Sequence, residues 1–296
     1  MPRPIQSALT RSVSLGTADR ALGRARARSA ELNGQLATGL RIQRPSDDPT
    51  GYAQARGLER VQGRLAQYRR TIDAAQAWAD RTQAELGSLG DLFASASEIG
   101  IRAANGILDA ESFAVQVDGL REEAISRLNA TSNGEHLFAG NATRTAPIDA
   151  ASGAVAAGDF SGRRDREIAP GLSVAVNALG ALEVDGVSAP DRLGALAAAI
   201  RNGDQDGVRA ALEGVQAGVD HYARLGGRSG TVVASLERAR AQVETQDLIL
   251  GEQRAGIEEI DLAEVLSANQ RQQTALEAAL RATATSVQTS ILNYLR

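Results

Sequence analysis

The feature that most constrains the fold is an unbroken run of heptad-spaced positions in the first third of the chain. Between residues 61 and 96, apolar or small side chains return at alternating steps of four and three. These positions are Val61, Leu65, Tyr68, Ile72, Ala75, Ala79, Thr82, Leu86, Leu89, Phe93 and Ala96. This spacing places the residues on one side of a helix and is typical of coiled-coil packing. We therefore predict a helix over 49–104, which at about 1.5 Å per residue is roughly 80 Å long and must pair with other helices.

Two further segments, one near each end of the chain, show the same spacing with thinner apolar stripes. The first covers 5–37, and its stripe includes Leu22, Leu32 and Leu36. The second covers 258–295, and its apolar positions are Leu262, Leu266, Leu276, Leu280, Val287 and Tyr294. A thin stripe buries too little surface to stabilise a helix alone. We predict that the two segments pack side by side and antiparallel, and that these positions form an assembly interface.

Charge is distributed unevenly between the two ends. Residues 1–44 contain eight arginines against Asp19 and Glu31, whereas 252–296 are mildly acidic. Opposite charge favours contact between the ends. Polar residues Asn269 and Gln273 interrupt the second stripe, which weakens a coiled coil but fixes its register.

A loop separates the first two helical segments. It has the sequence Arg44-Pro45-Ser46-Asp47-Asp48-Pro49. Two prolines around a polar triplet end the first helix, while Asp48 suits an N-cap and Pro49 the first helical position of the next. The paired acids could also suggest metal or acid–base chemistry. Adjacent side chains point apart, however, so we interpret the acids as capping residues.

The middle of the chain is punctuated by turn residues. We predict a helix over 112–132, a turn at Asn133-Gly134, a short apolar strand at 136–140, and β-hairpins within 141–190. Helices resume over 191–202 and 205–255, with a bend or loop at Gly226, Gly227 and Gly230.

The predicted fold is therefore mainly α: long terminal helices form an antiparallel coiled-coil bundle, with a small β-rich insert at its distal end. We expect three regions. Residues 1–44 with 256–296 form a terminal coiled-coil region for polymerisation, 45–140 with 191–255 a helical rod, and 141–190 an exposed insert.

Composition argues against most kinds of chemistry. The chain has no cysteine and no lysine, and its histidines are His136 and His221. A thiolate metal site, a phosphate-binding P-loop and Schiff-base catalysis all need residues that are missing. We expect no cofactor, no metal and no catalytic site.

No apolar stretch is long enough to span a membrane, so we expect no membrane insertion. The arginine-rich start resembles an organellar transit peptide, but the helical pattern continues without a cleavage-like break.

The surface that two thin-striped helices leave uncovered indicates a polymer subunit, because stacked copies would bury it. Two other classes stay open. A coiled-coil adaptor or nucleic-acid binder could use the basic N-terminal segment, although residues 1–44 lack the aromatic residues that stack on bases, so we expect no nucleic acid. An enzyme could use Glu258, Glu259 and Asp261, but acids at the start of a helix are more simply explained by the helix dipole.

Several motifs resemble those of the bacterial flagellin family. They are Leu36-Ala37-Thr38-Gly39-Leu40-Arg41-Ile42 before the Arg44–Pro49 loop, Ile72–Trp78, Gly134–Gly140, Gln272–Leu280 and Ile291–Leu295. The resemblance covers about 1–140 and 191–296 and not the insert. Within the family, the Arg-Pro-Ser-Asp-Asp-Pro form is more similar to the hook–filament junction proteins than to flagellin, which is the alternative.

The resemblance implies a non-enzymatic structural subunit of the bacterial flagellum. Its terminal helices would form the inner coiled-coil layer of a ring or tube of its own copies. Its neighbours would be flagellin and another hook-associated junction protein. A cytoplasmic export chaperone would hold the chain first, and the flagellar export apparatus would secrete it unfolded. Segments that fold only on assembly cannot polymerise too early.

Overall fold

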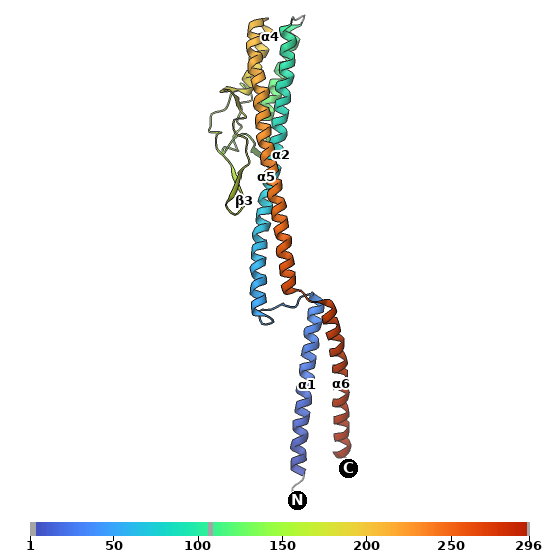
Figure 1. Cartoon of the computed structure of the whole chain (residues 1–296). Coiled ribbons are helices and arrows are strands. Elements are labelled where there is room, and N and C mark those ends of the chain that lie inside the picture. Colours follow the sequence, from blue (N-terminus) through green and yellow to red (C-terminus); the bar gives the residue numbers. More distant parts are fainter. Residues whose placement is uncertain (1–3, 106–108, 295–296) are drawn as a thin grey trace. The chain divides into compact units, whose positions relative to one another are not determined.

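Helices dominate the structure, a computed structural model that describes residues 4–105 and 109–294. For 4–15, 18 and 285–294 it describes the backbone element alone. The helices of the described residues are α1 (Pro4–Thr38), α2 (Pro49–Ala104), α3 (Ala110–Leu128), α4 (Ala189–Arg201), α5 (Gln205–Glu258) and α6 (Leu262–Tyr294). Figure 1 shows their order along the chain. The predicted mainly α fold is confirmed, and α2 has the predicted bounds.

The strands form three short antiparallel hairpins in the described residues. They are β1 (Thr131–Ser132) with β2 (Glu135–His136), β3 (Asp165–Ala169) with β4 (Leu172–Ala175), and β5 (Glu183–Val184) with β6 (Val187–Ser188). The predicted turn at Asn133-Gly134 joins β1 and β2, and both residues have positive φ, as a two-residue hairpin turn requires. The predicted strand at 136–140 is wrong. Leu137, Phe138 and Ala139 are buried, but they lie in a turn beyond β2.

Internal packing divides the chain into two units. Unit 1 is Met1–Gly63 with Leu248–Arg296, and unit 2 is Arg64–Asp247. Both divisions fall inside helices, within α2 and within α5. The predicted terminal region has its edges at 44 and 256, whereas unit 1 also includes the first turns of α2 and the last turns of α5.

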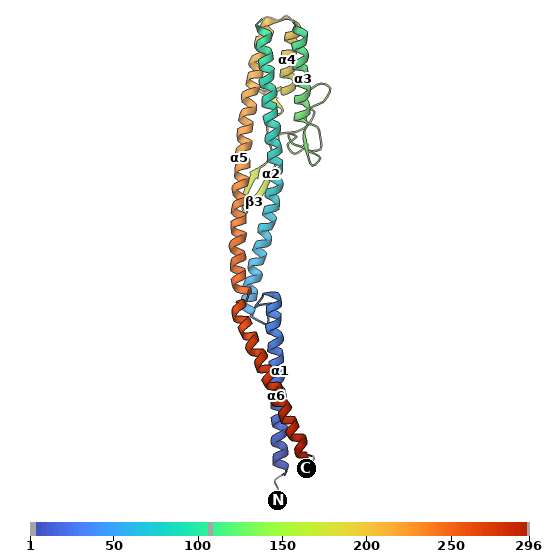
Figure 2. The same ribbon diagram turned by 90° about the vertical axis from the view of Figure 1, so that its right-hand side faces the viewer.

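In unit 2, the parts of α2 and α5 that belong to it run alongside α3 and α4 (Figure 2). The heptad seam of α2 faces inward: its positions from Leu65 to Ala96 are buried, apart from the half-buried Tyr68. Phe93 meets Tyr222 of α5 with ring centroids 5.3 Å apart, and α4 contributes Leu193, Leu196 and Ile200. The heptad positions of α2 therefore form part of the buried core of unit 2, as the sequence predicts.

The insert packs along α2 and α5 within unit 2. Arg164 stacks over the ring of Trp78 at 4.5 Å. The hydroxyl of Tyr222 donates to the carbonyl oxygen of Ala181 at 2.8 Å. The Nε2 atom of His221 lies 2.8 Å from the carbonyl oxygen of Gly180. Short hairpins bury little surface by themselves. They are therefore stabilised against the helices.

The predicted bend at Gly226, Gly227 and Gly230 is also wrong, since α5 continues through all three. Tyr222, Leu225, Ser229 and Leu236 are buried on its inner side. Because tertiary packing outweighs the low helix propensity of glycine, the helix is maintained.

Candidate assembly surface

The terminal helices α1 and α6 pack against each other in unit 1. The described start of α1 and the described end of α6 lie at the same end of the pair, so the two helices are antiparallel (Figure 1). Leu22 and Leu32 of α1 are buried and Leu36 is half-buried. The stripe predicted for the first helix therefore faces α6.

Polar contacts fix the register of this pair. The side-chain amide of Asn269 donates to Oδ1 of Asn33 at 3.1 Å, and that of Gln272 donates to the carbonyl oxygen of Ala25 at 2.9 Å. Asn269 is buried. Because a buried amide without its partner is costly, such a pair disfavours other registers.

The face of α6 toward α1 differs from the predicted leucine row. The less exposed positions are Val265, Ala268, Asn269, Gln272, Leu276, Ala279 and Thr283. By contrast, Leu262, Leu266 and Leu280 are 62%, 48% and 42% exposed. The heptad row of α6 therefore splits between a side that contacts α1 and a neighbouring side that is uncovered. Val287 and Tyr294 lie outside the residues whose side chains are described.

The Arg44–Pro49 loop connects α1 to α2. Gly39, with φ of 72°, ends α1 in a left-handed conformation that favours glycine. A carboxylate oxygen of Asp47 accepts hydrogen bonds from the amides of Gln43 at 3.0 Å and Arg44 at 2.9 Å. These bonds lower the pKa of Asp47 below its usual value. Asp48 accepts from the amide of Gly51 at 2.9 Å and caps α2. The capping interpretation agrees with these contacts for Asp48, whereas Asp47 accepts from amides of the loop and not from a helix terminus.

The joint between α5 and α6 gives its acidic residues different roles. Asp261 caps α6, because its Oδ1 accepts from the amides of Ala263 at 2.9 Å and Glu264 at 3.1 Å. Glu258 was expected in a solvated helix start, and that is wrong. It ends α5, is buried, and contacts the guanidinium groups of Arg56 at 3.0 Å and Arg254 at 3.2 Å.

Backbone hydrogen bonds join this region to the loop after α1. The amide of Arg41 donates to the carbonyl oxygen of Glu258 at 2.6 Å, and that of Ile260 donates to Gly39 at 3.1 Å. Leu40 and Glu259 form an isolated antiparallel bridge. The segment that follows α1 and the segment that precedes α6 are therefore joined to each other by backbone hydrogen bonds.

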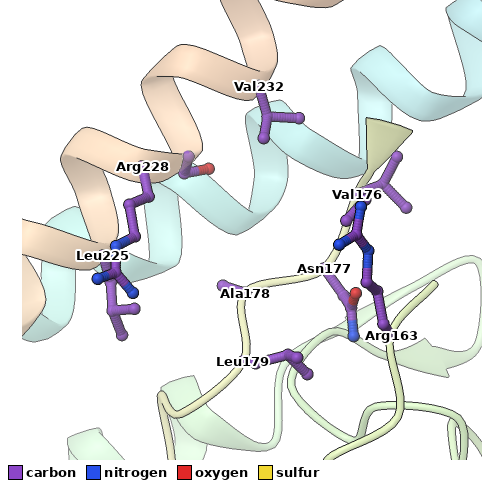
Figure 3. A pocket seen from close by; sticks show the side chains of 10 residues that line it. Arg163, Val176, Asn177, Ala178, Leu179, Leu225, Arg228 and Val232 are labelled. Carbon is purple, nitrogen blue, oxygen red and sulfur yellow. The ribbon is translucent and has the colours of Figure 1, made fainter. Parts of the chain in front are cut away.

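Unit 2 has a cavity of about 330 Å³ beside α5. Figure 3 shows residues 177–179 passing below α5, with Leu225 and Arg228 on one side and Arg163 on the other. Arg163 pairs with Asp165 at 2.7 Å.

Within the described residues, no group of three His, Cys, Asp or Glu side chains could hold a metal, and none of the helices there has the length and hydropathy to cross a membrane.

Residues 12–143 match the family described as the bacterial flagellin N-terminal helical region. This part of the chain is similar to the bacterial flagellin family. Two relatives extend the match. Flagellar hook-associated protein 3 of Salmonella typhimurium is 33% identical over 44% of this chain and 43% of that protein. Flagellar hook-associated protein 3 of Escherichia coli is 26% identical over 84% of this chain and 87% of that protein.

Solved structures agree with this architecture. A protein from Vibrio parahaemolyticus described as a flagellar hook-associated protein has a TM-score of 0.66 at 24% identity, covering 72% of this chain and all of that one. FlgL of Bacillus cereus has a TM-score of 0.60 at 17% identity, covering 67% of this chain and 99% of that one. At these identities the likeness establishes the fold alone.

Proposed function

We propose that this chain is a structural subunit of the bacterial flagellum that joins hook to filament through its terminal helices. The relatives named hook-associated protein 3 support this function over that of flagellin. The single observation that carries it is the exposure of Leu262, Leu266 and Leu280 beside a completed α1–α6 contact. Exposed leucines in one row indicate a surface that a neighbouring subunit covers.

The same proposal names the partners and the location. Copies of the chain would form a ring or tube, with flagellin on one side and a neighbouring hook-associated junction protein on the other. A cytoplasmic export chaperone would hold the chain before the flagellar export apparatus secretes it to the extracellular flagellum. Relatives with structural flagellar names support a non-enzymatic role.

Complementation tests the proposal. The chain would be produced in a motile bacterium from which the gene for its hook–filament junction protein has been deleted. We expect the wild-type chain to restore attached filaments, and a variant lacking 262–296 to keep unit 2 folded while failing to enter the flagellum. Filaments that stay attached with the truncated chain would contradict the proposal.

A finer variant separates assembly from folding. Substitution of Leu262, Leu266 and Leu280 together by serine removes apolar surface that is already exposed, so the helical content measured by circular dichroism should not change. We expect flagellin to be shed into the medium. The matched control is Leu172→Ser, which changes a leucine that is 52% exposed at the β3–β4 hairpin and should leave filaments attached.

A further inference from the structure

Three arginines form a basic row on α1. Arg20, Arg24 and Arg28 are four residues apart, so they lie above one another on the helix, and all three are exposed. Arg28 pairs with Glu31 at 2.8 Å. In the described residues, the Arg20 side chain donates to the carbonyl oxygen of Gly16 at 3.0 Å, and the Arg24 side chain donates to that of Arg20 at 3.4 Å. Like charges at this spacing repel each other within a helix, so the row favours an acidic partner.

The joint between α5 and α6 contains both charges: Arg56 and Arg254 pair with Glu258, and Arg41 pairs with Asp48. It also carries exposed carboxylates outside these pairs. Glu252, Glu259 and Glu264 are exposed, and no ion pair involves them among the residues that the structure describes. The exposed Leu262 and Leu266 follow directly along the chain. Exposed leucines and carboxylates close together along the chain can supply the apolar core and polar rim of a protein–protein interface.

The row and the joint cannot meet within one chain. The hydrogen bond from Ile260 to Gly39 holds the joint at the end of α1. Arg24 lies fifteen residues earlier on the same helix, which is about 22 Å at 1.5 Å per residue. At the level of the row, α6 presents Gln272, which bonds to Ala25. A contact between the row and the joint therefore involves two copies of the chain.

We propose that the basic row of α1 in one copy docks on the exposed carboxylates of the joint in a second copy. Arginine suits this contact because its aliphatic stem covers leucine while its guanidinium group binds carboxylate with two hydrogen bonds. Ala21, Gly23 and Ala27 near the row let a second copy approach closely, and nothing lies within 4 Å of the position of a Cβ atom at Gly23. Neighbouring copies would be offset by about 20 Å along α1. The inference rests on the proposed function and adds the contact through which copies bind each other.

Crosslinking tests the docking. Because the chain has no native cysteine, only its introduced thiols can react. Chains with Arg24→Cys and chains with Glu259→Cys would be produced together in the deletion strain, and isolated hook–filament structures treated with a short bis-maleimide. We expect a crosslinked dimer only when both chains are present. The matched control replaces Glu259→Cys by Glu98→Cys, an exposed position on α2. Junctions that contain both chains but give no dimer, or that give an equal amount with the control, would overturn the proposal.

Charge exchange gives a second measurement that does not depend on crosslink geometry. One variant carries Arg20→Glu, Arg24→Glu and Arg28→Glu, a second carries Glu252→Arg, Glu259→Arg and Glu264→Arg, and a third carries all six. We expect each of the two half-sets, the triple arginine variant and the triple glutamate variant, to lower the amount of chain in isolated flagella by about tenfold or more. The variant with all six substitutions should restore that amount. Half-sets that incorporate like the wild-type chain would overturn the docking. A wild-type chain that fails to restore filaments would instead refute the proposed function.

Discussion

The guanidinium group of Arg56 donates to the buried carboxylate of Glu258 at 3.0 Å, which links an early turn of α2 to the last residue of α5. The same carboxylate pairs with Arg254 at 3.2 Å. The carbonyl oxygen of Glu258 accepts from the amide of Arg41 at 2.6 Å. One residue thereby holds both connections to the terminal helices, because a buried carboxylate is stable only with its positive partners in place.

Glu258→Gln should loosen this joint without changing its shape. The amide side chain keeps its volume but loses the charge that attracts Arg56 and Arg254. We expect the Arg41 amide to exchange with solvent about tenfold faster in hydrogen–deuterium exchange, because local opening costs less free energy. Glu252→Gln, at an exposed position nearby, is the matched control. Equal exchange in both variants would show that the ion pairs do not stabilise the joint.

Two helical glycines of α5 should respond in opposite directions to the same substitution. A Cβ atom at Gly218 would overlap the ring of Phe93, whereas nothing lies within 4 Å of such an atom at Gly226. We expect Gly218→Ala to lower the free energy of unfolding by about 1–3 kcal/mol through overpacking. Gly226→Ala should raise it by about 0.5–1 kcal/mol, since alanine favours helix. Urea denaturation measures both, and a stabilised Gly218→Ala would contradict the close packing of α2 and α5.

Asp47 should make the loop between α1 and α2 sensitive to acid. The amides of Gln43 and Arg44 lower the pKa of this carboxyl from 3.8 in the folded chain. A lowered folded-state pKa gives stabilisation that is complete above the unfolded-state pKa and is lost as the pH falls through the folded-state value. We therefore expect Asp47→Asn to be less stable than wild type at pH 6, with a difference that shrinks below about pH 4. The control is Asp220→Asn at an exposed site on α5. A difference that stays constant with pH would exclude the carboxylate as its source.

The single tryptophan reports on the attachment of the insert. Arg164 covers Trp78 and pairs with Glu135 at 2.9 Å. Arg164→Ala should shift the tryptophan emission to longer wavelength and increase quenching by acrylamide, with a loss of about 1 kcal/mol in stability. Arg164→Met keeps an apolar cover and should change the emission less. Unchanged quenching with alanine would mean that other residues shield the ring.

Prediction from the sequence succeeded where a periodic pattern was long. The bounds of α2 follow from the Asp48-Pro49 start and from the seam through Phe93, because capping and burial agree on the same helix. It failed at Gly226, where packing of Tyr222 and Leu225 maintains the helix against local preference. The turn beyond β2 was mistaken for a strand because a short apolar run does not distinguish a strand from a buried turn.

The candidate surface was only partly accessible from the sequence. The row from Leu262 to Leu280 was identified, but the sequence could not divide it into a side that contacts α1 and an uncovered side. The role of Glu258 was missed because its arginine partners come from α2 and from the preceding turn of α5. A signal existed in the spacing of Arg254 and Glu258, which are four residues apart, as in a helical ion pair.

The bridge between Leu40 and Glu259 has a consequence for how such chains diversify. Both crossings out of α1 and into α6 occur at one level and bond to each other. We therefore expect the two terminal helices to be exchangeable between relatives as one unit, with Gly39 and Ile260 as its borders. A chimera cut at these borders would preserve every backbone hydrogen bond that closes the joint, so lineages could alter the helices that meet their neighbours while inheriting the remainder of the subunit unchanged.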